Sequence, residues 1–140
     1  MPAKDRYHNA VRHALEADGW TITDDPLPLR VGTRDLYVDL GAERLLAAER
    51  GSEKIAVEIK TFGGVSPIAS LEQALGQFVL YSDALELLEP ERLLFLAVPE
   101  SVKEFLAEPI GQLLLNKRRL RVLVFSVEKE RILQWLPEKS

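Results

Sequence analysis

Cysteine is absent from the 140 residues of the chain. Disulfide frameworks and cysteine-based zinc sites are therefore excluded, and we expect a reducing compartment, the cytoplasm. Long apolar runs are absent too, since no stretch approaches the roughly 20 residues that a membrane-spanning helix needs. Residues 1–19 have no signal-peptide core, so we expect neither export nor membrane insertion.

A net positive charge is also lacking, because 18 Lys and Arg stand against 22 Asp and Glu, a formal charge of -4. Domains that hold nucleic acid by bulk electrostatics are usually basic, so the charge counts against that mode of binding. Carboxylates that bind divalent cations would weaken this objection. Residues 116–121 (NKRRLR) are locally basic, a pattern that favours a solvated helix end over a DNA contact.

The chain does have a hydrophobic content of 46% beside 29% charged residues. At this length, such a composition suffices to bury one hydrophobic core without a disulfide or a structural metal. We therefore expect a single domain over residues 1–140.

The spacing of apolar residues predicts helices and strands along the whole chain. Helices are expected over residues 4–18, 70–88 and 101–117, the last interrupted at Pro109. Strands are expected over residues 20–23, 34–40, 92–98, 121–127 and 131–136. Residues 45–60 are expected to form a hairpin that turns near residues 50–53 (RGSE), and the proline-containing residues 24–33 an irregular connection.

The second helix has a sequence signal for its start. Ser70 and Gln73 fit a capping box, which would begin the helix near residue 70. The order of elements, with helices following antiparallel strands and then alternating with single strands, predicts a mixed α/β sheet flanked by helices.

The stretch KIAVEIKTF (residues 54–62) contains the first candidate for chemistry. Strand alternation would place Glu58 and Lys60 side by side on one face. A Glu-Lys pair on the solvent face of a strand is commonly only a surface ion pair, worth roughly 0 to 1 kcal/mol. The pair therefore needs support from other parts of the chain.

Asp39 supplies that support if its strand lies beside the strand that carries Glu58. Two carboxylates, a backbone carbonyl and waters suit a hard cation such as Mg²⁺ or Mn²⁺. A cation of this kind polarises a phosphate and acidifies a bound water, while Lys60 orients that water or stabilises charge in the transition state. The combination is suited to phosphodiester hydrolysis.

These residues resemble the Asp...Glu-x-Lys signature of the PD-(D/E)xK nuclease superfamily, which has the restriction-endonuclease-like fold. The resemblance covers VDL at residues 38–40 and VEIK at residues 57–60. It implies that Asp39 and Glu58 bind the metal and that Lys60 serves the attacking water. One departure is that Asp39 is not preceded by proline.

The second predicted helix adds a further match. Gln77 and Tyr81 stand four residues apart, as in the Gln-xxx-Tyr element of RecB-like members, and Gln73 lies one turn earlier on the same face. The alternative interpretation is a polar stripe on an amphipathic helix. Superfamily members often carry a glutamate on the first helix, where this chain has His8, a residue able to bind metal or phosphate or simply to face solvent.

A closer resemblance covers almost the whole chain. The segments that carry it are YHNAVRHALEADGWTITDDPL, DLYVDLGAERLLAAE, KIAVEIKTF and LEQALGQFVLY, which are similar to the XisH family, the fdxN-element excision controlling factors of cyanobacteria. This resemblance implies a role in programmed DNA rearrangement, a separate site-specific recombinase and a small companion protein of the XisI type. The oligomeric state is open, a homo-oligomer included.

The register of the predicted hairpin decides whether the two carboxylates meet. A tight turn would place Glu58 opposite Leu45, with Asp39 about six residues, or roughly 20 Å, farther along the strand. A wider loop, or a bulge at residues 41–42, would restore proximity. Glu43 is the alternative first ligand if the register differs.

Three functions are therefore weighed. The first is a metal-dependent deoxyribonuclease with Asp39, Glu58 and Lys60 at its centre. The second is a non-catalytic accessory protein of the same fold that binds DNA, the recombinase or the companion, an interpretation that His8 and the acidic charge favour. The third is an α/β scaffold in which Glu58 and Lys60 form a surface ion pair.

Overall fold

The structure is a computed structural model that describes residues 3–47 and 51–137. Its helices are α1 (Ala3–Ala17), α2 (Pro67–Leu88), α3 (Lys103–Ala107) and α4 (Pro109–Asn116), with a 3-10 turn η1 (Glu100–Val102) before α3. Its strands are β1 (Thr21–Asp24), β2 (Leu27–Val31), β3 (Arg34–Val38), β4 (Leu40–Ala47), β5 (Gly51–Ile59), β6 (Arg92–Pro99), β7 (Val122–Ser126) and β8 (Arg131–Leu136).

Six of the strands form one mixed sheet in the order β1-β4-β5-β6-β7-β8. The central strands β5, β6 and β7 are parallel, and the other neighbours are antiparallel. Parallel neighbours need a crossover, which α2 provides between β5 and β6 and the α3–α4 segment provides between β6 and β7. The prediction of a mixed α/β sheet flanked by helices is confirmed. Among the described residues, no helix is long and apolar enough to cross a membrane.

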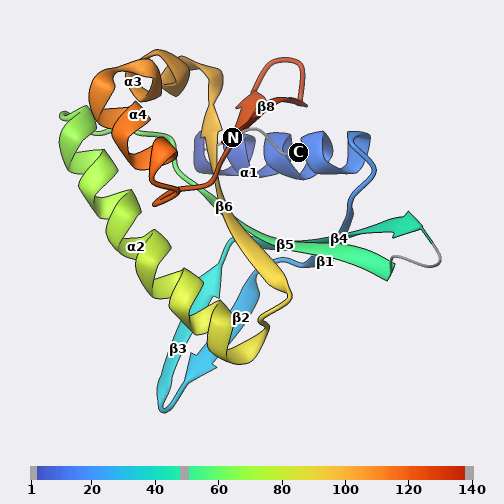
Figure 1. Ribbon diagram of the computed structural model, residues 1–140. Coiled ribbons are helices and arrows are strands. Elements are labelled where there is room, and N and C mark those ends of the chain that lie inside the picture. Colours follow the sequence, from blue (N-terminus) through green and yellow to red (C-terminus); the bar gives the residue numbers. More distant parts are fainter. Residues whose placement is uncertain (1–2, 48–50, 138–140) are drawn as a thin grey trace.

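Helices cover both faces of this sheet, as Figure 1 shows, with α1 behind it and α2, α3 and α4 in front. One core lies on the α1 side and includes Leu15, Leu40 and Val57. The other lies on the α2 side and includes Phe78 and Leu94. A strand buried on both faces loses the alternation of polar and apolar residues, which is why residues 55–58 of β5 are all buried.

The segment predicted to be an irregular connection is a strand instead. Residues 27–31 form β2, which pairs with β3 in a two-stranded ribbon that lies beside α2 (Figure 1). Leu27 and Leu29 are buried in the α2-side core, so burial of every second side chain favours the strand despite Pro28. Proline is compatible with the rim of a ribbon, where its missing N–H leaves no gap in a central ladder.

The predicted strand over residues 34–40 is interrupted at Asp39. β3 ends at Val38 and β4 begins at Leu40, so the chain leaves the ribbon and enters the six-stranded sheet at Asp39. Val38 belongs to the core on the α2 side, whereas Leu40 belongs to the core on the α1 side. The prediction of one continuous strand over residues 34–40 was therefore wrong, because a bend at Asp39 separates Val38 from Leu40.

The second helix begins earlier than its predicted capping box. Ser66 is the N-cap residue, and its hydroxyl accepts a hydrogen bond from the N–H of Ala69. Pro67 occupies the first helical position, where its missing N–H has no cost. Ser70 and Gln73 thus lie inside the helix. The capping-box prediction was wrong because the Ser66-Pro67 pair starts the helix before Ser70.

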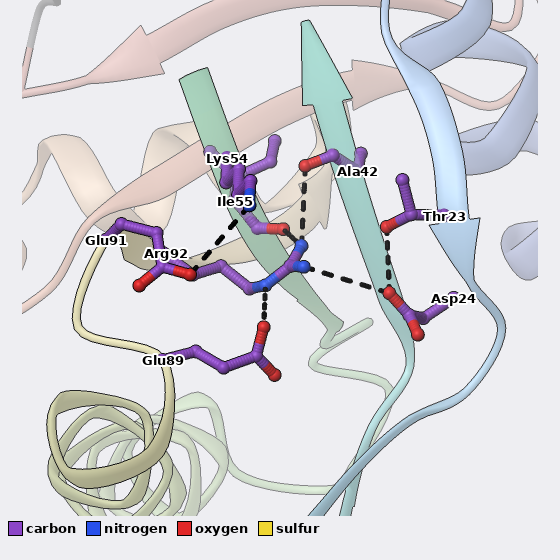
Figure 2. Close-up of polar contacts among 8 residues, drawn as sticks. All are labelled: Thr23, Asp24, Ala42, Lys54, Ile55, Glu89, Glu91 and Arg92. Carbon is purple, nitrogen blue, oxygen red and sulfur yellow. Dashed lines mark hydrogen bonds and ion pairs between the residues drawn. The ribbon is translucent and has the colours of Figure 1, made fainter. Parts of the chain in front are cut away.

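A buried arginine joins β6 to the antiparallel half of the sheet (Figure 2). Arg92 Nη1 donates to the carbonyl oxygen of Ile55 at 2.9 Å, Nε donates to Glu89 at 3.1 Å, and Nη2 lies 3.8 Å from Asp24. Gly41 leaves the necessary space, because a Cβ there would lie 3.0 Å from Arg92 Nη1. Arg92 Nη1 also donates to the carbonyl oxygen of Ala42 on β4 at 3.5 Å, so this one side chain contacts β1, β4 and β5 and the end of α2 from β6.

Candidate active site

The register of β4 and β5 brings Asp39 and Glu58 together. Leu40 is paired with Val57, so the residue before Leu40 lies next to the residue after Val57. Leu45 is paired with Ser52, six residues before Glu58, and the expectation of a Glu58–Leu45 pair was therefore wrong. No bulge at residues 41–42 is needed.

The predicted position of the hairpin turn explains that error. Gly51, Ser52 and Glu53, which were expected in the turn, belong to β5, and residue 50 lies outside the described residues. Ala47 at the end of β4 is already paired with Gly51 at the start of β5, so the chain reverses direction earlier than a turn at residues 50–53 would allow. The earlier reversal changes the register and brings Glu58 beside the start of β4.

Each of the two carboxylates is held by a backbone N–H of the opposite strand. The N–H of Asp39 donates to Glu58 Oε1 at 3.2 Å, and the N–H of Ile59 donates to Asp39 Oδ2 at 2.8 Å. This reciprocal arrangement fixes both side chains and uses one oxygen of each. The second oxygen of Glu58, Oε2, lies 3.7 Å from Lys60 Nζ.

Glu58 lies in an environment that opposes its charge. Its exposed fraction is 7%, and burial is the largest cause that raises its pKa to about 7 from the ordinary 4.5, with the Asp39 carboxylate as the second cause. Lys60 acts in the opposite direction. A carboxyl group with a perturbed pKa beside a second carboxylate and an ammonium is typical of functional sites.

Tyr81 of α2 lies near this centre. Burial and then the Glu58 and Asp39 carboxylates raise the pKa of Tyr81. Gln77, one turn earlier, has a buried Oε1 with no hydrogen-bond partner among the described residues. Gln73 is exposed at the rim of the cavity described next. Only Gln73 matches the alternative of a solvated polar stripe, since Gln77 and Tyr81 are partly buried.

A cavity of about 510 Å³ opens at the carboxyl end of β5. It is lined by Tyr7 and His8 from α1, Ser70 and Gln73 from α2, Asp39, Lys60 and the following residues 61–64. Glu58 lies deeper than the lining. In open α/β sheets, the carboxyl ends of strands are the usual place for ligands.

His8 is anchored at the wall of this cavity. Its Nε2 lies 2.9 Å from Asp25 Oδ1, and Arg12 also contacts the Asp25 carboxylate. Sequence reasoning missed Arg12 and Asp25; the i, i+4 spacing of His8 and Arg12 was the available signal, whereas Asp25 is brought in only by the fold. His13 pairs with Glu130 outside the cavity.

Two other predicted features lie away from the site. Glu43, the alternative ligand, faces Lys54 across the ladder and Thr21 on its other side, so it does not meet Glu58. The basic run begins where α4 ends, and Lys117, Arg118 and Arg119 are exposed there, as expected for a solvated helix end.

The donor set fits a hard divalent cation. Asp39 and Glu58 supply carboxylate oxygens, the ligand type that Mg²⁺ and Mn²⁺ prefer. The raised pKa of Glu58 reflects first its burial and then the Asp39 carboxylate beside it, with Lys60 acting in the opposite direction. Within residues 6–46 and 51–137, no group of three or more His, Cys, Asp or Glu side chains is arranged around one point, so His8 does not complete a three-ligand set.

Comparison with known proteins gives a consistent result. The chain matches the family described as XisH protein over residues 1–133. It is similar to the crystal structure of an XisH family protein from Nostoc punctiforme PCC 73102, with 42% identity, a TM-score of 0.83, and 94% of this chain and 99% of that chain covered. It is equally similar to an fdxN element excision controlling factor protein from Anabaena variabilis, with 42% identity, a TM-score of 0.83 and coverages of 94% and 98%. No curated protein matches the chain.

Proposed function

The chain belongs to the XisH family. From this membership and the geometry of the site, we propose that it acts in the cytoplasm as a controlling factor for excision of a DNA element. We propose further that it acts through a metal-dependent deoxyribonuclease site of the PD-(D/E)xK type. The observation that carries the nuclease part is the hydrogen-bonded meeting of Asp39 and Glu58 at the carboxyl end of β5, with Lys60 beside them. A surface ion pair does not explain a Glu58 that is 7% exposed.

In this proposal the carboxylates of Asp39 and Glu58 would hold Mg²⁺ or Mn²⁺. When bound, the cation would polarise a phosphodiester and lower the pKa of a bound water. The residues themselves contribute rigidity, because each carboxylate is fixed by an N–H of the neighbouring strand. A preorganised site avoids reorganisation at the moment of reaction.

Lys60 is the proposed catalytic cation. It lines the cavity, and its ammonium lies 3.7 Å from Glu58 Oε2. With a substrate bound, Lys60 would orient the attacking water or stabilise the charge that develops on the phosphate. Gln73 and His8, which line the same cavity, are proposed to contact the DNA backbone, and Tyr81 and Gln77 of α2 are proposed as accessory residues.

A second candidate function is a non-catalytic accessory protein that uses the same cavity to bind DNA, the recombinase or the companion. The observation in its favour is that the described residues supply only two carboxylates and no third ligand at one point. His8, which stands where superfamily members often carry a glutamate, is engaged with Asp25. The formal charge of -4 also fits a protein that depends on a partner for DNA affinity.

A nicking assay on supercoiled and branched DNA with Mn²⁺ separates these two functions. Lys60→Ala should retain metal and DNA binding while cleavage falls on the order of a hundredfold. Lys54→Ala is the matched control, since Lys54 lies on β5, the strand that Lys60 directly follows, but pairs with Glu91. It should cleave like the wild type.

Two outcomes would contradict the nuclease proposal. Cleavage that persists undiminished in Lys60→Ala and Glu58→Gln would identify a contaminating nuclease. DNA binding without cleavage in every sample, with and without the companion protein, would favour the accessory function.

A further inference from the structure

A second cavity, of about 240 Å³, lies at the opposite end of α2 from the candidate active site. Its lining includes Ser82 and Glu86 of α2, and Glu86 is 13 residues beyond Gln73, or roughly 20 Å along the helix axis. Leu85, Pro90 and Leu93 contribute apolar walls. The cavity therefore belongs to neither the carboxylate pair nor Lys60.

Two arginines line this cavity, and they differ in how their charge is balanced. Arg92 has carboxylates of Glu89 and Asp24 beside it, as Figure 2 shows. Arg121 forms no ion pair with any carboxylate in residues 6–46 and 51–137. A partly buried cation without a counterion is unfavourable, because desolvation is not repaid by Coulombic attraction.

The contacts of Arg121 leave its outer edge available. Its Nε donates to the carbonyl oxygen of Leu94 at 3.1 Å, and its guanidinium lies 5.4 Å from the ring centroid of Phe78. These contacts hold the planar group in place but engage only one of its nitrogens in a hydrogen bond. Burial alone lowers the pKa of Arg121, and no carboxylate of the described residues, Glu86 included, offsets that effect.

Ser82 supplies a second polar group of this cavity. Its Oγ is buried and has no hydrogen-bond partner among the described residues. A buried hydroxyl without a partner is unfavourable, and a rotation of the Ser82 side chain toward a polar group in the cavity would relieve it. An anion in the cavity would pair with the guanidinium directly.

We propose that this cavity binds a small monocarboxylate with a short apolar chain. The two terminal nitrogens of Arg121 match the two oxygens of a carboxylate, and the leucines and Pro90 match an apolar chain. Arg121 forms no ion pair within the described part of the chain, and its single positive charge suits a monoanion. The Glu86 carboxylate also lines the cavity and repels a phosphate dianion more strongly than a monoanion.

The test is a titration of the ¹⁵N-labelled full chain with sodium butyrate, with sodium chloride at the same ionic strength as reference. Amide signals of Ser82, Leu94 and Arg121 should shift and saturate with a dissociation constant on the order of 1 mM, a modest affinity that fits so small a ligand. Inorganic phosphate should bind more weakly than butyrate. No saturable shift at tens of millimolar butyrate, or tighter binding of phosphate, would overturn the proposal.

Variants make the test specific. Arg121→Gln should weaken butyrate binding at least about tenfold, whereas Arg119→Gln, an exposed neighbour, should not change it. Glu86→Gln should tighten butyrate binding, and weaker binding in this variant would mean that butyrate does not bind as an anion in this cavity, which would overturn the proposal. If Arg121→Gln does not fold, the Glu86→Gln result and the wild-type titration still decide.

The chain's own carboxylates need one further control. Glu138→Gln removes a carboxylate that lies outside the described residues, and it should bind butyrate like the wild type. Clearly tighter binding by Glu138→Gln would mean that this carboxylate competes for the cavity, which would overturn the proposal of an external ligand.

Discussion

At the scale of single residues, Glu58 couples stability to pH. Its pKa is about 7 in the folded chain against an ordinary 4.5, so the folded state holds its proton more tightly than the unfolded state. The resulting stabilisation is present in full below pH 4.5 and is lost as the pH rises through about 7. Between these values, Glu58 should lower the free energy of unfolding by up to about 1.4 kcal/mol per pH unit.

This first prediction is measured by urea denaturation in EDTA between about pH 5 and pH 8. Glu58→Gln cannot titrate at this position, so its stability should lack that component of the slope and should exceed the wild-type value at the upper end of the range. Identical pH profiles for the two proteins would contradict a raised pKa of Glu58.

The same two carboxylates predict a response to divalent cations. Mg²⁺ or Mn²⁺ at about 100 times its dissociation constant should stabilise the wild type by about 2.7 kcal/mol. The effect should weaken below about pH 7, because a proton on Glu58 competes with the cation. Thermal denaturation with and without the cation measures it.

Variants locate this response. Asp39→Asn keeps an oxygen for the N–H of Ile59 but removes a charge, and it should abolish most of the cation effect, as should Glu58→Gln. Glu43→Gln is the matched control on β4, because Glu43 faces Lys54 and not Glu58. If Glu43→Gln lost the stabilisation by the cation and Asp39→Asn kept it, the cation would bind at Glu43 and the proposed site would be wrong.

At the scale of elements, the start of α2 controls one wall of the cavity. Ser66 caps the helix by accepting from the N–H of Ala69, so Ser66→Ala should cost about 1 kcal/mol. Ser70→Ala, which alters the residue that the capping-box pattern indicated, should change stability by less than about 0.5 kcal/mol. Urea denaturation of both variants measures the difference in the free energy of unfolding. Equal destabilisation by the two substitutions would contradict the assignment of Ser66 as the N-cap residue.

Arg92 is the residue that joins elements, and its removal should be costly. Arg92→Ala leaves the carbonyl of Ile55 and the carboxylates of Glu89 and Asp24 without their partner (Figure 2). We expect a loss of about 2 to 4 kcal/mol, below the full cost of breaking a buried pair because both carboxylates are about one third exposed.

Two further variants serve as controls for Arg92→Ala. Arg92→Lys should lose less than Arg92→Ala, since it keeps the charge but not the fork of donors. Arg119→Ala, at an exposed position, should lie within about 0.5 kcal/mol of the wild type. A denaturation midpoint of Arg92→Ala equal to that of Arg119→Ala would contradict a structural role for the network.

At the scale of the whole molecule, the acidic charge predicts dependence on a partner. A chain with a formal charge of -4 should bind DNA weakly by itself, and a small companion of the XisI type should add affinity. Fluorescence anisotropy with labelled duplex and branched DNA, with and without the companion, measures the gain.

The salt dependence identifies the source of that gain. If the companion supplies phosphate contacts, the affinity of the complex should fall more steeply with salt than that of the chain alone. Failure of the two proteins to associate at micromolar concentration, or tight DNA binding by the chain alone, would contradict the prediction.

The sequence by itself determined the fold class and the candidate chemistry. Helical and strand periodicities depend on local spacing, so the order of helices and strands was predictable except at β2 and at the start of α2. The Glu58-x-Lys60 spacing likewise predicts a shared direction whatever surrounds the strand. His8, Gln73, Gln77 and Tyr81 were identified by resemblance.

Only the tertiary structure decided which residues meet. The register of β4 and β5 depends on where the chain turns and on which faces are buried, and local propensity does not specify either. In the observed register Asp39 and Glu58 lie side by side, whereas a register shifted by six residues would leave the two carboxylates far apart. The anchoring of His8 by Asp25 and the uncompensated Arg121 likewise arise from segments far apart in sequence, where burial and charge balance exist only after the helices have packed on the sheet.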